Sequence, residues 1–313
     1  MSYGDKKRVL ITGATGMVGG NIASLAQEAG WKIFMPTRKE LDLRNSEFVL
    51  KYLAERRINS IIHCAAKVGG IAANIAAPAD FVLENTRIDS AIINSARALE
   101  IPDLIYFASS CMYPRDTSQP MKIEQILTSA LEPTNEGYAL SKIVGAKSVA
   151  AVAEQDHLNW RVLIPSNLYG PRDNFNENTS HLVPAVIRKI HRAIYNEEKT
   201  VQVWGDGEAR REFTFVEDVA DFIINHFHDL RRWPLMMNIG FGRDFSINDY
   251  YTEIARTLSF SGTFVHDLSK PVGMRRKLLD SGVAKDYGWR PQTTLESGIR
   301  TTVKWFKENV ANG

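Results

Sequence analysis

The chain has 313 residues, of which 44% are hydrophobic and 24% charged, fractions typical of a globular protein with one large or two modest domains. A formal net charge of +2 argues against a nucleic-acid-binding surface, because such surfaces need a clear excess of positive charge. The two cysteines, Cys64 and Cys111, predict neither a disulfide framework nor a metal site, and the first apolar run is short, so we expect a cytoplasmic protein without a membrane span.

Strand-like and helix-like segments alternate in the first half of the chain. Continuous apolar runs predict buried strands at 8–14, 32–37, 60–66, 104–110 and 160–165. Helical spacing predicts helices at 21–30, 46–57, 78–99 and 138–155, with Gly30 at the end of the first and Ser46 as the cap of the second. Regular alternation predicts an α/β fold, a Rossmann-type doubly wound parallel sheet with helices on both faces.

The second half of the chain is less regular. A helix is expected at 181–194, short strands at 201–205 and 211–216, another helix within 216–230, and two or three helices after 246. We therefore expect residues 1–170 to form the doubly wound domain, with a returning segment near 211–240. Residues 171–313 would then form mainly a smaller α/β lobe.

Three glycines follow the first expected strand, in the stretch ITGATGMVGG. Gly13 permits a tight turn, Gly16 lets the backbone approach a pyrophosphate, and Gly19 allows the next helix to pack closely on the sheet. The start of that helix, at Met17 and Val18, offers N–H groups and a partial positive charge to phosphates. The strand–loop–helix context therefore predicts a dinucleotide site.

The end of the second strand indicates which dinucleotide binds. An acidic residue there would bond the ribose 2′-hydroxyl of NAD, whereas this chain has Arg38 followed by Lys39. A guanidinium group can pair bidentately with a 2′-phosphate, so Arg38 predicts NADP(H). The alternative is that both side chains are solvated surface charges.

Tyr138 and Lys142 lie four residues apart and share one helix face. An ammonium group beside a phenol is expected to lower the phenol's pKa, giving an acid that can protonate an alkoxide. Ser109, at the exit of the fourth strand, can hydrogen-bond the same carbonyl oxygen. Each pattern is common by chance, but together with the glycine loop they predict hydride transfer between a nicotinamide and a carbonyl carbon.

This ordered set resembles the extended short-chain dehydrogenase/reductase superfamily, and further segments resemble the GDP-L-fucose synthase family within it. The resemblance implies a cytoplasmic oxidoreductase and isomerase that converts GDP-4-keto-6-deoxy-mannose to GDP-L-fucose by 3,5-epimerisation and 4-keto reduction. The matching segments are AAKVGGI (65–71), SSCMYP (109–114), LEPTNEGYALSK (131–142), NLYGPRDNF (167–175), SHLVPAVIRKIH (180–191), VWGDGEARREF (203–213) and KPVGMRRKLLD (270–280).

The resemblance also implies roles for individual residues. Cys111 would be the base and His181 the acid of the epimerisation, because the 4-keto group acidifies the protons on C3 and C5 and proton carriers are needed on both faces. Taken alone, Cys111 would be a small buried hydrophobe and His181 a hydrogen-bonded residue at a helix start.

Ligand contacts are carried over in the same way. Asn167, Trp204 and Arg211 would contact the GDP-sugar, Lys189 and the cluster 275–277 are phosphate candidates, and Asn135 could touch the sugar. Without the resemblance, Trp204 is equally expected to be a core residue and Arg211 a structural ion-pairing residue. The expected cofactor contacts beyond the glycine loop and Arg38 are Ala65, Lys142, Pro165, Asn167 and His181.

Other functions remain open. The nearest rival is a C4-reductase of a related GDP-4-keto-sugar, of the colitose or 6-deoxy-heptose type, with reduced or no epimerase activity. A 4-epimerase that retains NAD is disfavoured by Arg38, and a non-catalytic NADP-binding regulator is disfavoured by the set of Ser109, Tyr138 and Lys142. The apolar faces of 78–99 and 138–155 are consistent with a homodimer. We expect neither nucleic acid nor membrane as a partner.

Overall fold

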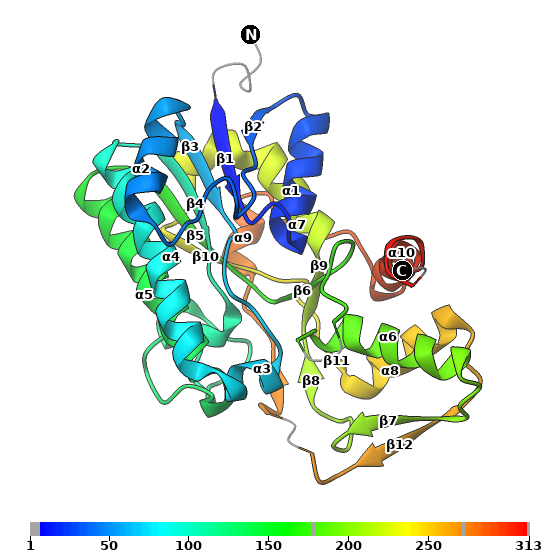
Figure 1. Ribbon diagram of the computed structural model, residues 1–313. Coiled ribbons are helices and arrows are strands. Elements are labelled where there is room, and N and C mark those ends of the chain that lie inside the picture. The colour runs from blue at the N-terminus through cyan, green and yellow to red at the C-terminus, as the bar shows by residue number, and fades with distance from the viewer. Residues whose placement is uncertain (1–6, 177–178, 271–272, 312–313) are drawn as a thin grey trace.

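The computed structural model describes residues 7–176, 179–270 and 273–311. Its largest unit is a six-stranded sheet of order β10-β5-β4-β3-β1-β2, parallel throughout (Figure 1). The doubly wound sheet predicted from the sequence is confirmed. Its strands are β1 (Arg8–Thr12), β2 (Lys32–Phe34), β3 (Ser60–His63), β4 (Asp103–Phe107), β5 (Asn159–Pro165) and β10 (Met236–Ile239).

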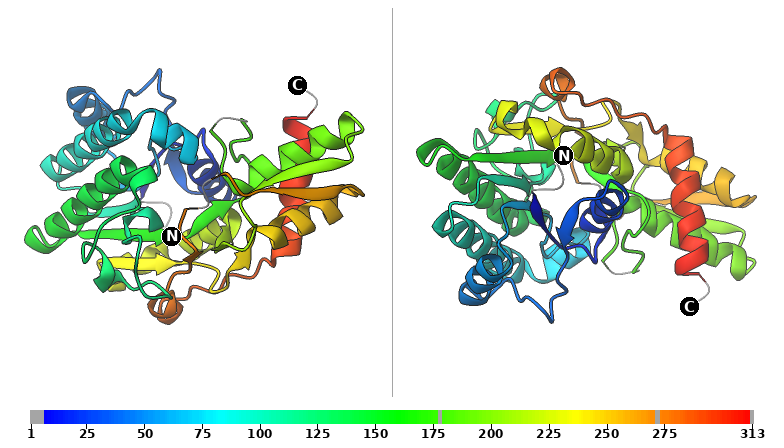
Figure 2. Two further views of the ribbon diagram at one scale, coloured as in Figure 1. Left: turned by 90° about the horizontal axis from the view of Figure 1, so that it is seen from below. Right: turned by 90° about the horizontal axis from the view of Figure 1, so that it is seen from above.

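Helices cover both faces of this sheet (Figures 1 and 2). One face carries α2 (Ser46–Glu55), α4 (Pro78–Ala98) and α5 (Glu136–Gln155), and the other carries α1 (Met17–Glu28), α7 (Val216–His226) and α9 (Gly282–Asp286). Neighbouring strand residues such as Leu10 and Ile11 belong to different apolar clusters, because successive side chains in a strand point to opposite faces. Both faces are buried, which explains the continuous apolar runs in the sequence.

Element boundaries differ from the predictions where turn chemistry intervenes. The first four strands end earlier than predicted, because the residues that follow them form the loops at the carboxyl edge of the sheet. The cap of α2 is Asn45 and not Ser46; its side chain accepts a hydrogen bond from Phe48 N at 3.2 Å. Both residue types are good caps, so spacing alone could not choose between them. Gly30, just beyond α1, has φ +74°, as a residue ending a helix should.

The smaller lobe lies to one side of the sheet (Figure 2). Its helices α6 (Leu182–Tyr195), α8 (Ile247–Leu258) and α10 (Leu295–Asn309) surround a third apolar cluster. The remaining helix is α3 (Ile71–Ala76), and the short strands are β6 (Asn167–Tyr169), β7 (Thr200–Trp204), β8 (Arg210–Arg211), β9 (Phe213–Phe215), β11 (Phe245–Ser246), β12 (Thr263–Asp267) and β13 (Arg276–Lys277). They form three small sheets, β11-β8-β13, β12-β7 and β6-β9.

The chain passes between the two units more than once. Beyond the first lobe segments, α7 and β10 pack on or pair with the large sheet. A second return, through α9 and Trp289, was not predicted; the Trp289 indole N–H donates to Gly240 O at 2.7 Å. Across the described ranges no helix has the length and hydropathy needed to cross a bilayer, and no group of three metal-ligating side chains is found there.

Candidate functional site

The glycine loop after β1 is shaped by two close approaches. Gly13 has φ +68°, and a Cβ there would lie 2.9 Å from Ala65 N. A Cβ on Gly19 would lie 2.6 Å from Gly13 O, so α1 packs against the loop itself, whereas we expected packing on the sheet. Gly16 precedes α1 with an extended backbone. A side chain at Gly13 or Gly19 would therefore displace the loop or the segment after β3.

The surroundings of this loop fit a dinucleotide. No side chain caps α1 and its first turn has no acidic residue, so the N–H groups of Met17 and Val18 suit an anionic ligand. The Thr12 hydroxyl oxygen accepts hydrogen bonds from the backbone N–H groups of Cys64 and Ala65, both at 3.1 Å, and so joins the loops after β1 and β3. The strand order reverses between these two strands, which is where doubly wound sheets bind nucleotides.

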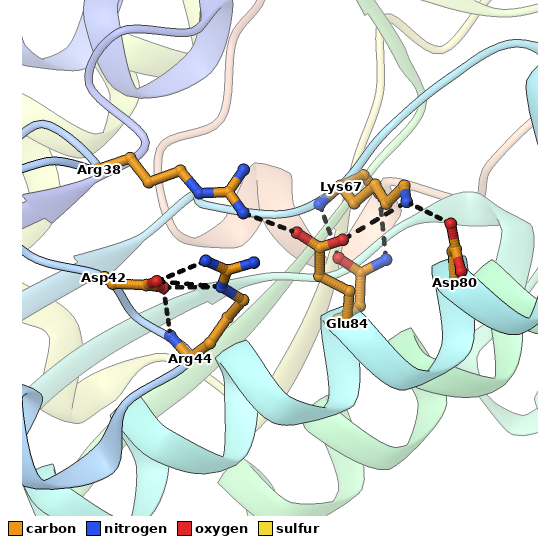
Figure 3. Close-up of polar contacts among 7 residues, drawn as sticks. Arg38, Asp42, Arg44, Lys67, Asp80 and Glu84 are labelled. Carbon is orange, nitrogen blue, oxygen red and sulfur yellow. Dashed lines mark hydrogen bonds and ion pairs between the residues drawn. The ribbon is translucent and has the colours of Figure 1, made fainter.

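Arg38 lies beyond β2, where the ribose of a bound dinucleotide is expected (Figure 3). Its Nη2 is 3.3 Å from Glu84 Oε1, and its side chain is 67% exposed. The other carboxylate oxygen of Glu84 is 3.4 Å from Lys67 Nζ, which also lies 3.1 Å from Asp80. Because exposed ion pairs contribute little free energy, Glu84 can give up Arg38 to a stronger anion such as a phosphate.

Ser109, Cys111 and Tyr138 lie together at the carboxyl end of β4. Ser109 caps a 3₁₀ turn (Ser110–Met112), its Oγ accepting from Cys111 N at 3.2 Å. Burial raises the pKa of the Tyr138 phenol well above its usual value; the neighbouring Cys111 adds to this, and a hydrogen bond with the Ser109 side chain opposes it. The structure thus brings two of the predicted reductase residues into contact and places the predicted base beside them.

Lys142 does not behave as the sequence predicted. Its Nζ donates to Phe107 O at 3.0 Å and lies 4.6 Å from the centre of the Tyr106 ring. The prediction that Lys142 lowers the pKa of Tyr138 is wrong for this structure, since burial raises that pKa. Burial also lowers the pKa of Lys142 itself, while the carboxylate of Asp89 counteracts the effect.

Two hydrogen-bond donors face the Cys111 sulfur. Asn135 Nδ2 lies 3.2 Å from Sγ, and Lys277 Nζ, from β13 of the smaller lobe, lies 3.6 Å from it. Asn135 Oδ1 is buried without a hydrogen-bond partner among the described residues. The thiol is therefore adjacent to a positive charge and to an amide oxygen that a ligand hydroxyl could satisfy.

His181 is the residue that precedes α6. Its side chain is open to solvent, yet the surrounding protein removes enough water to lower its pKa, and the charge of Lys277 lowers it further. The neighbouring Ser180 Oγ is buried and also has no hydrogen-bond partner among the described residues. Lys277 is thus next to Cys111 and close enough to act electrostatically on His181.

The other predicted ligand-binding residues are spread over the lobe. Trp204 is 46% exposed, with Lys270 Nζ 5.8 Å from its ring centre, so it is not a core residue. Burial lowers the pKa of Arg211, and Glu132 counteracts this. Lys189 Nζ donates to Gln202 O at 2.9 Å and to the Tyr251 hydroxyl at 3.2 Å, away from the reaction centre.

Two further predictions concern the joint between the units. Pro165 ends β5 and is buried, and Asn167 Nδ2, from β6, donates to Glu212 O at 3.3 Å, just before β9. In the basic cluster at 275–277, Arg276 pairs with Asp244 while Lys277 faces Cys111.

Sequence reasoning missed a buried polar chain under the reaction centre. His63 lies within the apolar strand β3, and its ring bonds Thr12 on one side and Asp89 on the other; Asp89 in turn accepts from the Tyr106 hydroxyl. A histidine inside an otherwise apolar strand was the one available signal, because a buried imidazole needs hydrogen-bond partners.

Comparisons with known proteins identify the family of the chain. The family model described as "NAD dependent epimerase/dehydratase family" matches residues 9–240. The chain is 45% identical over 300 residues to a GDP-L-colitose synthase of Yersinia pseudotuberculosis (96% of this chain, 97% of the relative) and 44% identical over 303 residues to a GDP-L-fucose synthase of Azorhizobium caulinodans (97% of each). The solved structure of a Campylobacter jejuni GDP-mannoheptose C4 reductase with NADP bound superposes with a TM-score of 0.87 at 29% identity, covering 96% of this chain and 98% of that one.

Proposed function

Because the chain belongs to the NAD dependent epimerase/dehydratase family and, within it, to the GDP-L-fucose synthases, we propose that it converts GDP-4-keto-6-deoxy-mannose to GDP-L-fucose with NADPH. The observation that carries the proposal is the meeting of Ser109, Cys111 and Tyr138 at the carboxyl end of β4. A carbonyl bound there would have its oxygen beside two hydroxyls and its adjacent carbons beside a thiol. One small site therefore suits both reduction and epimerisation.

In the reduction step, Ser109 and Tyr138 hold the C4 carbonyl oxygen by hydrogen bonds. Burial raises the pKa of Tyr138, so the phenol carries its proton at neutral pH and can deliver it to the alkoxide oxygen. Lys142 takes part through the cofactor, whose binding its ammonium group favours, and not by lowering the pKa of the phenol. Bound NADPH supplies the hydride to C4.

In the epimerisation step, Cys111 removes the proton from C3 or C5. This role requires a thiolate. The ammonium group of Lys277, 3.6 Å from the sulfur, stabilises its negative charge. His181 returns a proton to the opposite face of the carbon. Asn135, whose side-chain oxygen has no hydrogen-bond partner within the part of the chain that the structure describes, holds a sugar hydroxyl and fixes the position of the thiol.

The cofactor is held by groups at the carboxyl edge of the large sheet. The N–H groups at the start of α1 bind the pyrophosphate, and Arg38 exchanges Glu84 for the 2′-phosphate. The remaining cofactor contacts in this proposal are Gly13, Gly16, Met17, Val18, Gly19, Ala65, Lys142, Pro165, Asn167 and His181.

The GDP moiety is held by the smaller lobe. Arg211 neutralises diphosphate charge, Trp204 offers an exposed aromatic face, and Lys189 supplies a further cation. Residues 171–313 are thus proposed as mainly the substrate lobe and residues 1–170, with the returning segment near 211–240, as the NADP domain.

The second candidate is a C4-reductase of a related GDP-4-keto-sugar with reduced or no epimerisation. The observation in its favour is the strong similarity to a GDP-L-colitose synthase and to a heptose C4 reductase. The presence of Cys111 beside Lys277 favours the bifunctional reaction.

We further infer a homodimer and a cytoplasmic location. Leu83 on α4 and Leu140 and Val144 on α5 are exposed apolar side chains on two helices that pack together. Such a surface can pair with its copy across a four-helix bundle. Cys64 and Cys111 are both free thiols, as expected in a reducing compartment.

One experiment tests the main proposal. The protein is incubated with NADPH and, separately, the GDP-activated 4-keto forms of 6-deoxy-mannose, 3,6-dideoxy-mannose and 6-deoxy-heptose in heavy water. NMR should show GDP-L-fucose carrying deuterium at C3 and C5. Reduction without deuterium at either carbon would replace the proposal with the C4-reductase.

A further inference from the structure

A chain of buried hydrogen bonds runs under the glycine loop toward α5, the helix that carries Tyr138 and Lys142. Thr12 Oγ1 is 2.7 Å from His63 Nδ1, and His63 Nε2 is 3.0 Å from Asp89 Oδ1. The Tyr106 hydroxyl donates to Asp89 Oδ2 at 2.5 Å. Thr12, His63, Asp89 and Tyr106 are all at most 2% exposed. The proposed reaction uses none of these groups directly.

The hydrogen-bond partners define where the protons lie. The Thr12 oxygen already accepts from the N–H groups of Cys64 and Ala65, so its hydroxyl proton is left to donate to His63 Nδ1. His63 therefore carries its proton on Nε2 and donates it to Asp89. With donors on both oxygens, Asp89 is held as a carboxylate anion.

Lys142 is the cation beside this anion. Its Nζ lies over the Tyr106 ring, whose hydroxyl bonds Asp89, and it donates a hydrogen bond to Phe107 O. Gly145, one turn along α5, provides the space, since a Cβ there would lie 2.2 Å from the Tyr106 hydroxyl and 2.7 Å from Asp89 Oδ2. The glycine lets α5 lie directly on the Tyr106–Asp89 pair.

We propose that Asp89 is a positioning residue of the reductase site, the buried counter-charge that keeps Lys142 protonated and in place. This inference rests on the proposed role of Lys142 in cofactor binding and reduction. Among the described residues, the titratable side chains beside Lys142 are Asp89 from α4, Cys64 from the end of β3 and Tyr106 from β4. Of these, Asp89 alone is held as an anion in this structure.

The electrostatics agree with this assignment. Burial works against the charge of both groups, lowering the pKa of Lys142 and opposing the ionisation of Asp89. Lys142 together with the hydrogen bonds from His63 and Tyr106 nevertheless keeps the pKa of Asp89 below its usual value. Without Asp89, burial would act unopposed by that carboxylate, so Lys142 would lose its proton at a lower pH.

The first test follows NADPH binding across pH 6–10 by quenching of protein fluorescence, which needs no sugar substrate. Affinity should fall as Lys142 loses its proton. In Asp89→Asn this fall should begin at a pH lower by about one unit or more, the size expected for removal of a nearby opposite charge. Tyr106→Phe, which keeps the ring and the carboxylate, should follow the wild-type curve. Identical curves for all three proteins, whatever their melting temperatures, would reduce Asp89 to a structural role.

A second measurement applies even where Asp89→Asn does not fold. In the wild type the pKa of Asp89 is lowered, so its contribution to stability is present above its unfolded pKa and is lost as the pH falls. In Lys142→Met, burial raises the pKa of Asp89 instead. The stability of the variant relative to the wild type should therefore increase as the pH falls from 8 to 5. Urea unfolding measures the difference, and a difference independent of pH would overturn the proposal. Neither readout depends on which sugar the enzyme converts.

Discussion

The thiol of Cys111 lies 3.6 Å from the ammonium nitrogen of Lys277, although 166 positions of the chain separate them. The sulfur comes from the turn after β4 of the large sheet, and the lysine comes from β13 of the smaller lobe. The proposed base and its neighbouring charge therefore meet only when both units are folded against each other.

Cys111→Ser should lower deuterium uptake at C3 and C5 by about 10²–10⁴-fold, the usual contribution of a general base, because a serine hydroxyl is a far weaker base than a thiolate. NMR of the GDP-sugar in heavy water measures the uptake. Cys64→Ser is the matched control and should exchange normally. Normal uptake by the Cys111 variant would remove this residue from the proton transfer.

Tyr138→Phe should lower NADPH oxidation with the 4-keto-sugar by about 10²–10⁴-fold, because the alkoxide at C4 loses its proton donor. NADPH binding and deuterium exchange should persist, since neither requires the phenol. Absorbance of NADPH follows the reduction. Reduction at an undiminished rate would show that another group donates the proton.

Arg38→Ala should weaken NADPH binding by at least about tenfold, since a charge-assisted hydrogen bond contributes about 1.5–3 kcal/mol, while NADH binding stays the same. Glu84→Gln should tighten NADPH binding, because Arg38 would no longer be shared with a carboxylate. The control is Arg44→Ala, whose guanidinium already pairs with Asp42 (Figure 3). Titration calorimetry gives the affinities, and equal losses for both dinucleotides would contradict the 2′-phosphate role.

Asp173→Asn should stabilise the protein above pH 7. Asp173 Oδ2 is buried with no hydrogen-bond partner among the described residues, and burial raises the pKa of this carboxyl to about 7. A raised carboxyl pKa costs stability increasingly as the pH rises from about 4 to about 7, up to roughly 4 kcal/mol. Urea unfolding at pH 5 and pH 8 should show a clearly larger gain at the higher pH; equal effects at both would exclude an ionised Asp173.

Leu83→Asp combined with Val144→Asp should convert the proposed dimer to a monomer, because two charges would replace apolar contacts on the α4–α5 surface. Light scattering after size exclusion measures the mass. Val265→Asp, equally exposed but on β12, should leave the mass unchanged. A wild-type mass of one chain would already refute the dimer.

Local rules were sufficient for the large sheet and the glycine loop, because an apolar run or a glycine spacing carries its own physical cause. They failed where a contact with a residue far away in the sequence determines the structure or the pKa of a side chain. Ser46 and Asn45 are equally good caps, and the raised pKa of Tyr138 depends on burial that spacing does not reveal. The partners of Lys142 and Cys111 come from other strands and helices, so no pattern within the motifs could identify Asp89 or Lys277.

The chain returns twice to the large sheet, and this limits how the protein can be divided into fragments or recombined with a relative. A fragment that stopped at the end of β6 would lack β10 and would leave one edge of β5 unpaired. It would also lack Trp289 and α7, and so expose apolar surface on the face that carries α1. Swapping the smaller lobe with that of a relative therefore requires junctions after β6, before α7, after β10 and on both sides of the segment from α9 to Trp289, and a single crossover after β6 should yield an aggregating chimera.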